Sequence, residues 1–229
     1  NIIVMTANNG NQITCYWGSG SAPSWRVLIC LKEKALNNAN LVLLSMSDKE
    51  HKAQDILAIN PRGQLPTFKD GDIIINESIA ICHYLAETYK EQGNHLLPQD
   101  SLAHAKVIQR IHELQNLYGK LIGLTRYYWK RKPYYTVEVV AIKKEELITE
   151  IKLWDTYITD GYLVGTEFSL ADACLFPVIA FMVRLGMDIS TYPQIDAFYN
   201  RHITRQSIQD TWPPHWKESN NKSILKSIS

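Results

Sequence analysis

The pattern of the sequence changes once, after residue 92, and this change limits the fold more than any other feature. Before it, short strand-like and helix-like segments alternate, separated by Gly, Pro and Asp turns. The strand-like segments are Gln12–Trp17, Leu41–Leu44, Pro66–Phe68 and Ile73–Ile75, and the helix-like segments are Trp25–Lys34, His51–Ile59 and Asn76–Tyr89. Asp70-Gly71-Asp72 is typical of a hairpin turn. The order βαβαββα predicts an α/β domain over residues 12–92.

Only helical patterns follow residue 100. Apolar residues recur at helical spacing over Leu102–Leu121, Val137–Ile158, Ser169–Leu185 and Tyr192–Asp210. The fold class expected is therefore α/β plus all-α, with an all-helical domain over residues 100–218 and tails at 1–11 and 219–229. A chain of 229 residues is long enough for two such domains.

Composition excludes several classes of function. The net charge of +1 argues against nucleic acid as a partner, although Arg126–Tyr135 mixes basic and aromatic residues. No run of about 20 apolar residues is present, so no membrane segment is expected. Cys15, Cys30, Cys82 and Cys174 are scattered without a CxxC or Cys/His cluster, which favours free thiols, a cytoplasmic protein and no metal site.

Two predicted helix starts carry residues that suit an anion. Ser21-Ala22-Pro23-Ser24 joins a strand to a helix, and Glu77-Ser78 opens a later helix. Helix N-termini present unpaired N–H groups and a positive dipole end, which attract negative charge. On spacing alone, capping is the favoured interpretation of Ser21, and it accounts equally well for Glu77-Ser78.

Two further motifs bear on the fold. Gln64-Leu65-Pro66 puts proline at the start of a strand, where a cis bond would expose the backbone of Leu65 to a ligand and a trans bond would make an ordinary turn. Ser169-Leu170-Ala171-Asp172 is a capping box with Asp in place of Glu, and we interpret it as a folding signal.

Together these motifs resemble one family, the cytosolic glutathione S-transferases. The first half is similar to their thioredoxin-like domain and the second half to their helical domain. Gln64-Leu65-Pro66 matches the family's cis-proline motif, and Phe168–Asp172 matches its capping box. Asn76–Leu85 matches the helix that binds the γ-glutamyl group. The stretches Trp17–Ser21, Trp25–Val27, Glu50–Lys52 and Trp212–Trp216 look most like the rho class.

The resemblance implies conjugation of the glutathione thiolate to small hydrophobic electrophiles, a detoxification reaction. A thiol with a pKa near 8.5 needs stabilisation of its anion at neutral pH. Ser21 aligns with the catalytic serine of the delta and zeta classes. Ser19 on the same loop and Tyr16, near the tyrosine of other classes, are the alternatives.

The resemblance also implies the other contacts. The main chain of Leu65, next to Pro66, would pair with the cysteinyl part of glutathione, and Glu77 and Ser78 would hold its γ-glutamyl end. His51, Lys52 and Gln64 would meet its glycine carboxylate, although a solvated helix start accounts equally well for His51-Lys52. The candidates for contact with the electrophile are Tyr118, Arg126, Tyr127, Trp129 and Trp212. The surplus of Tyr and Trp over Phe suggests that aromatic rings line this site.

Two other functions remain open. A glutathione-dependent thiol oxidoreductase would need a nucleophilic Cys at the first helix, where this chain has Ser21 and Ser24. A non-enzymatic glutathione-binding member of the fold need not keep the motifs at Gln64 and Glu77. The resemblance further implies glutathione as co-substrate, no metal and a homodimer.

Overall fold

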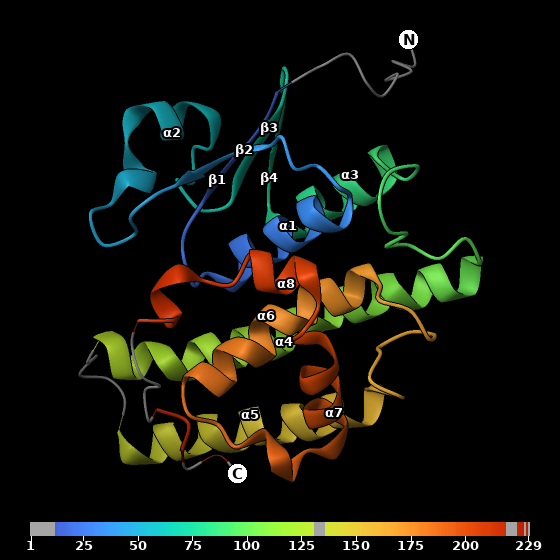
Figure 1. Cartoon of the computed structure of the whole chain (residues 1–229). Coiled ribbons are helices and arrows are strands. Elements are labelled where there is room, and N and C mark those ends of the chain that lie inside the picture. Colours follow the sequence, from blue (N-terminus) through green and yellow to red (C-terminus); the bar gives the residue numbers. More distant parts are fainter. Residues whose placement is uncertain (1–11, 131–135, 219–223, 227, 229) are drawn as a thin grey trace.

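The computed structural model describes residues 12–130, 136–218, 224–226 and 228. The tail 1–11, residues 131–135 and most of 219–229 lie outside the described residues, as do the side chains of Trp129 and Lys130. Figure 1 shows a sheet with its helices above and a helical half below, and the two halves pack together. Within the described residues no helix is long and apolar enough to cross a membrane.

The sheet has four strands in the order β2-β1-β3-β4. The strands are β1 (Ile13–Trp17), β2 (Asn40–Leu43), β3 (Thr67–Asp70) and β4 (Ile73–Asn76). β2 runs parallel to β1, whereas β3 and β4 are antiparallel to their neighbours. Gly71 has φ +58°, as the tight turn between β3 and β4 requires, so the predicted hairpin is confirmed. This sheet and its helices form the expected thioredoxin-like fold.

Three helices accompany the sheet: α1 (Ala22–Glu33), α2 (Gln54–Ile59) and α3 (Ser78–Thr88). In Figure 1, α1 and α3 lie between the sheet and the helical half, with α2 at the far side of the sheet. The prediction of one helix over His51–Ile59 was wrong. Glu50–Lys52 is a separate 3₁₀ turn, because Ala53 is extended (φ −64°, ψ 153°) and divides it from α2.

The helical half contains α4 (Ser101–Lys130), α5 (Val137–Tyr157), α6 (Leu170–Arg184), α7 (Pro193–His202) and α8 (Gln206–Asp210). The prediction of one helix over Tyr192–Asp210 was wrong, because Arg205 is extended (φ −66°, ψ 133°) and α8 starts anew after it. α6 is buried through nearly its whole length. Its capping box is confirmed: the Ser169 N–H and Oγ–H donate to Asp172 Oδ2 over 2.7 and 2.6 Å.

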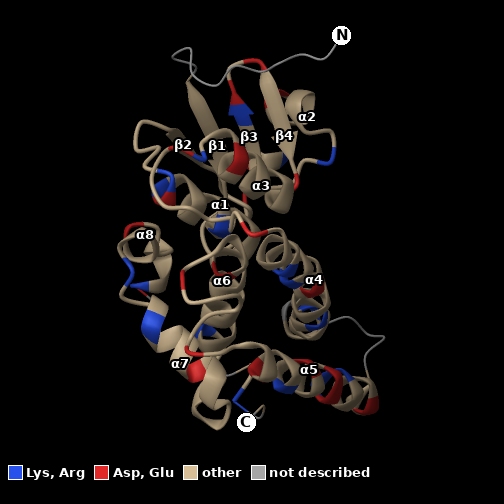
Figure 2. Ribbon diagram, turned by 90° about the vertical axis from the view of Figure 1, so that its right-hand side faces the viewer, with Lys and Arg blue, Asp and Glu red and all other residues tan. Residues whose placement is uncertain are grey.

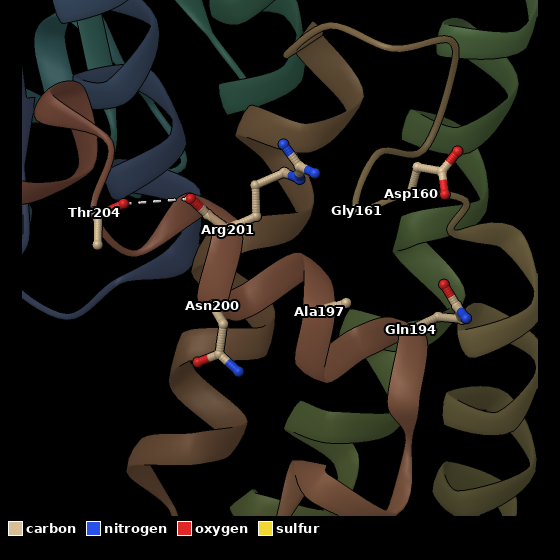
Figure 3. A pocket seen from close by; sticks show the side chains of 7 residues that line it. All are labelled: Asp160, Gly161, Gln194, Ala197, Asn200, Arg201 and Thr204. Atoms are coloured by element: carbon tan, nitrogen blue, oxygen red, sulfur yellow. Dashed lines mark hydrogen bonds between the residues drawn. The ribbon is translucent and has the colours of Figure 1, made fainter.

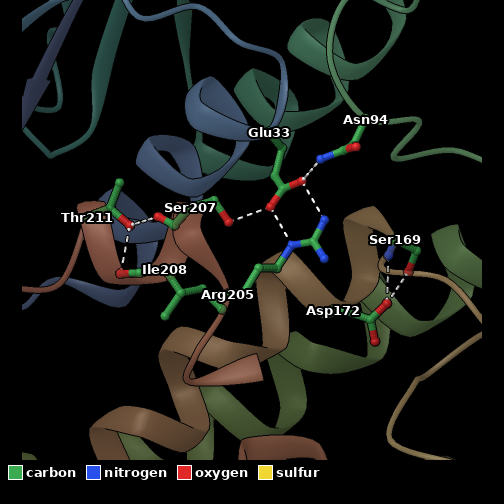
Figure 4. A network of polar contacts seen from close by, with 8 residues as sticks. All are labelled: Glu33, Asn94, Ser169, Asp172, Arg205, Ser207, Ile208 and Thr211. Atoms are coloured by element: carbon green, nitrogen blue, oxygen red, sulfur yellow. Dashed lines mark hydrogen bonds and ion pairs between the residues drawn. The ribbon is translucent and has the colours of Figure 1, made fainter. Parts of the chain in front are cut away.

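A polar network joins the two halves at the end of α1 (Figure 4). Glu33 is 3% exposed. It accepts hydrogen bonds from Arg205 Nε over 2.6 Å, Arg205 Nη2 over 2.8 Å and Asn94 Nδ2 over 2.7 Å, and also from the Ser207 hydroxyl. Burial favours the neutral acid, but these bonds outweigh it and hold the pKa of Glu33 below its ordinary value. The buried carboxylate is thus fully paired.

Candidate active site

A cavity of about 740 Å³ lies between the sheet half and α4. Every residue predicted to bind glutathione lines it, namely Ser21, His51, Lys52, Gln64, Leu65, Pro66, Glu77 and Ser78. The opposite wall includes Tyr118 and Arg126 of α4. The fold thus brings together residues that are more than 50 positions apart in the sequence.

Ser21 lies at the N-terminus of α1. It is the N-cap residue, and its Oγ accepts a hydrogen bond from the Ser24 N–H over 3.3 Å. The Ser24 hydroxyl in turn accepts from the Gly18 N–H over 3.2 Å, which ties the loop to the helix. Because the cap uses Ser21 Oγ as an acceptor, its hydroxyl proton stays available for donation to an anion in the cavity.

The two alternative hydroxyls lie elsewhere. Ser19 Oγ is 2.7 Å from Nδ1 of His215, on the C-terminal segment that covers this loop, and Ser19 is not a lining residue. Gly20 has φ +76°, and a Cβ there would come within 2.7 Å of the His215 ring. Tyr16 is half-buried in β1, and it also does not line the cavity.

The loop before β3 is held from inside by Asn60, which the sequence analysis did not single out. Its Nδ2 donates to the Gln64 carbonyl and to Thr67 Oγ1, each over 2.9 Å. The Leu65–Pro66 bond is cis. Asn60 is 3% exposed and lines the cavity, so it positions the segment expected to face the peptide backbone of a ligand. An Asn that precedes a Pro at a turn was the available signal.

Glu77 adopts a backbone conformation that favours glycine, with φ +77° and ψ 110°. Such outliers in non-glycine residues concentrate at functional sites. Glu77 immediately precedes α3, and Ser78 is its first residue. The conformation places a carboxylate residue and the N-terminus of α3 on the same wall of the cavity.

Unpaired polar atoms concentrate around this cavity. In the described part of the chain, five buried side-chain atoms lack a hydrogen-bond partner, and four of them belong to Arg26, His51 and Asn76. All three residues line the cavity. Because buried polar groups are almost always paired, such a concentration indicates a polar ligand site.

The charge of the lining is predominantly positive. Its basic side chains are Arg26, Lys52 and Arg126, with His51 and His112, and Glu77 is the one carboxylate among the described lining residues. Burial raises the pKa of the Tyr118 phenol, and the guanidinium groups of Arg26 and Arg126 partly oppose this rise. Elsewhere both signs of charge occur along α4 and α5 (Figure 2). The cavity therefore suits a ligand with more negative than positive groups.

Three of the five residues predicted to contact the electrophile are not among the described lining of the cavity. Tyr127 and Trp212 are not lining residues, and the side chain of Trp129 lies outside the described residues. Trp212 packs edge-on against Trp25, with ring centroids 5.2 Å apart. Of the Tyr and Trp side chains described, Tyr118 alone lines the cavity, so most of the aromatic surplus lies in packing.

No described cysteine reaches this cavity. All four thiols are buried, and burial raises the pKa of Cys15 to about 12. A thiol with such a pKa is neutral and unreactive at physiological pH. The site therefore offers hydroxyls where a thiol oxidoreductase would need a thiolate.

A second pocket has a similar volume, about 730 Å³, but a different character. It lies beside α7 and is lined by Asp160, Gly161, Gln194, Ala197, Asn200, Arg201 and Thr204 (Figure 3). Arg201 lies 4.9 Å from the ring of Tyr162 and donates to its hydroxyl over 3.3 Å. None of the buried unpaired atoms belongs to its described lining. Size alone does not distinguish the two pockets, but unpaired polar groups do.

Comparisons with known proteins agree with this fold. Residues 20–88 match the model of the glutathione S-transferase N-terminal domain, and residues 122–206 match that of the C-terminal domain. The chain is 43% identical over 223 residues to glutathione S-transferase A of Pleuronectes platessa, covering 95% of this chain and 99% of the relative.

Solved structures are similar over the whole fold. A glutathione S-transferase from the Antarctic clam Laternula elliptica superposes with a TM-score of 0.88 at 39% identity, covering 95% of this chain and 100% of that one. A Sulfitobacter homologue with bound glutathione has a TM-score of 0.76 at 26% identity, covering 87% and 96%. With both family domains present and relatives at this level of identity, the chain belongs to the glutathione S-transferase family, and it is an enzyme of that family.

Proposed function

We propose that this transferase joins the thiolate of glutathione to small hydrophobic electrophiles, as in detoxification, and that Ser21 stabilises the thiolate. The observation that carries this proposal is the single cavity that collects all the expected glutathione contacts together with most of the buried unpaired polar atoms. In the reaction the thiol proton passes to water. The sulfur then attacks the electrophilic carbon, a C–S bond forms, and the leaving group departs with its electron pair.

The energy required is within reach of the groups present. Lowering a thiol pKa of about 8.5 by about two units takes about 2.7 kcal/mol. A hydrogen bond from a hydroxyl to a charged sulfur supplies about 1.5–3 kcal/mol. The N-terminus of α1 adds about 0.3–2 kcal/mol. Ser21, as the N-cap of α1, lies where both contributions act on the same atom.

The remaining contacts follow the shape of glutathione. Glu77 and Ser78 take its γ-glutamyl end, and the main chain of Leu65 pairs with its cysteinyl unit. His51, Lys52 and Gln64 receive the glycine carboxylate. Lys52 Nζ now donates to the Arg62 carbonyl over 2.8 Å and lies at the edge of the cavity. Tyr118 and Arg126, which face these residues across the cavity, contact the electrophile.

Several finer assignments belong to the same proposal. They are the rho class, a cytoplasmic location, a homodimer, and domain boundaries at 12–92 and 100–218. The motifs at Trp17–Ser21 and Trp212–Trp216 support the class. The two family models, over 20–88 and 122–206, fall within the proposed domains. Light scattering of the purified chain tests the homodimer, since a monomeric mass would exclude it.

The test of the mechanism compares two serines on one loop. Ser21→Ala should lower the conjugation rate with a nitro-activated aryl chloride by about 10²-fold or more at pH 6.5, because it removes the hydrogen bond to the sulfur. Ser19→Ala is the matched control and should retain most of the rate. The assignment is wrong if Ser21→Ala keeps full activity. A large loss in Tyr16→Phe would then identify the tyrosine instead.

A further inference from the structure

Arg26 carries a buried charge that nothing in the described chain pairs. It lies in the second turn of α1, is 1% exposed, and lines the cavity. Neither Nε nor Nη2 has a hydrogen-bond partner among the described residues. A guanidinium group carries five N–H donors and a positive charge, and it has no acceptor.

Among the described residues, the buried charges of Glu33, Lys34 and Asp172 have hydrogen-bond partners. Lys34 is 0% exposed, and its Nζ donates to the Asn94 carbonyl over 2.8 Å. Arg205 binds Glu33 through two nitrogen atoms. A buried cation with neither hydrogen-bond partners nor a counter-charge is strongly destabilising, and folded proteins tolerate it where a ligand supplies them. The exception at Arg26 therefore points to an anion that binds at this place.

The position of Arg26 indicates which anion this is. Helix side chains lean toward the helix N-terminus, and Arg26 follows the N-cap Ser21 by five residues. Pro23 precedes Arg26 by one turn and lines the same cavity. Tyr118 of α4 senses the charge of Arg26 from the opposite wall. The charge of Arg26 also acts on the buried thiols of Cys30, Cys82 and Cys174, so the cation lies where α1 meets α3, α4 and α6, beside the cavity that Ser21 also lines.

The carboxylates of glutathione already have other partners in the proposed function. Lys52 and the N-terminus of α3, on the lining of the same cavity, serve the two ends of the tripeptide in that proposal. Glu77 is the one carboxylate of the described lining, and no ion pair joins it to Arg26. The sulfur, next to Ser21, is the remaining negative group of the bound molecule.

We propose that the buried guanidinium of Arg26 is the counter-charge for the glutathione thiolate. This rests on the proposed function, because it assumes that glutathione binds with its sulfur at Ser21. Arg26 then complements the hydroxyl: Ser21 donates a hydrogen bond to the sulfur, and Arg26 provides positive charge from the lining of the same cavity. An anionic group on the electrophile could use the same charge, so the experiment separates these two sources.

The experiment titrates the ultraviolet thiolate absorbance of glutathione bound to the full-length protein. Arg26→Met should raise the thiol pKa by about 1–2 units, as loss of an opposite charge within a few ångströms predicts. Arg26→Lys should keep it low. The affinity for S-methylglutathione, which has no thiolate, should change by less than about twofold, because the lost interaction concerns only the charged sulfur. Arg201→Met, in the separate pocket beside α7, is the matched control and should leave the pKa unchanged.

Turnover with an uncharged aryl chloride gives a second readout. Below the new thiol pKa, kcat of Arg26→Met should fall about tenfold for each unit of pKa shift, with little change in the KM for glutathione. An unchanged thiol pKa would overturn the inference. So would a loss confined to anionic electrophiles, or an equal loss of S-methylglutathione affinity. Failure of both Arg26 variants to fold would also overturn it, since the guanidinium would then be structural. If the wild type binds no glutathione, the proposed function itself is wrong.

Discussion

The two ends of α1 hold buried charges in opposite ways. At its C-terminal end, Glu33 is surrounded by donors from Arg205, Ser207 and Asn94 (Figure 4). Near its N-terminal end, Arg26 is equally buried and has no partner for two of its nitrogen atoms in the described chain. At the C-terminal end, the hydrogen bonds of Glu33 connect the sheet half to the helical half. The unpaired end lies in the cavity, where a bound ligand can supply the missing charge.

The largest effect should come from breaking the paired end. Glu33→Ala removes the carboxylate and leaves the guanidinium of Arg205 without its buried partner. Breaking a buried ion pair in this way costs about 3–5 kcal/mol of unfolding free energy. Urea denaturation at neutral pH measures it. Glu33→Gln, which keeps the size and part of the hydrogen bonding, should lose less, and a loss below about 1 kcal/mol in Glu33→Ala would contradict the account.

The pH dependence of this pair has a definite sign. The pKa of Glu33 is lowered in the folded chain, so its stabilisation is complete above the unfolded pKa of about 4.3. It is lost as pH falls through the folded pKa. The wild type should therefore lose stability below about pH 4 more steeply than Glu33→Gln, which has no carboxyl to protonate.

His202 shows a third way to bury a basic group, which is to remain neutral. It is 2% exposed, its Nε2 lies 2.8 Å from the Gly161 carbonyl, and burial lowers its pKa to about 4. The unfolded chain binds a proton near pH 6.5 and the folded chain does not, so stability should fall as pH drops from 6.5 to 4. The full shift corresponds to about 3 kcal/mol.

A variant without the imidazole should lose this dependence. Stability curves of His202→Gln, recorded from pH 7.5 to 4.5, should be flatter than those of the wild type even if the variant is less stable throughout. Parallel curves would show that His202 is protonated in the folded state. Arginine cannot become neutral in this way, and that is why the unpaired Arg26 needs an anion.

A smaller effect is expected in the capping box of α6. Ser169→Ala removes the hydroxyl that donates to Asp172 over 2.6 Å and should cost about 0.5–2 kcal/mol. Thermal unfolding measures it, with conjugation activity retained below the transition. A cost near zero would mean that the backbone N–H groups of Ser169 and Leu163 satisfy Asp172 without the hydroxyl.

The smallest change in stability should come from the unpaired end. Replacing an unpaired buried cation with a residue of similar volume is often neutral or stabilising, so Arg26→Met should unfold within about 1 kcal/mol of the wild type or above it. Parallel urea denaturation with Glu33→Ala measures the contrast directly. A loss as large as that of Glu33→Ala would remove the distinction between the two ends of α1.

Local motifs made much of this molecule predictable. The hairpin at Gly71, the capping box at Ser169 and the succession βαβαββα along the chain follow from local patterns. The expected glutathione contacts are also local motifs, and the fold gathers them in one cavity. Such signals are readable because turn chemistry and helix caps act within a few positions of the chain.

The features that could not be predicted from the sequence depend on tertiary contacts. The break between α7 and α8 comes at Arg205, whose partner Glu33 is more than 170 positions away. Asn60 resembles any turn residue until its bonds to Gln64 and Thr67 are known. Arg26 sits in the apolar run from Trp25 to Leu31, and its lack of a partner is visible only in three dimensions.

The most direct measurement is the pH titration of glutathione bound to the wild-type protein. If the start of α1 is built to receive the sulfur as an anion, the ultraviolet thiolate signal should titrate with a pKa at least about one unit below the 8.5 of an ordinary thiol, so that thiolate is a major species near neutral pH. Bound glutathione that titrates with the pKa of the free tripeptide would contradict the account.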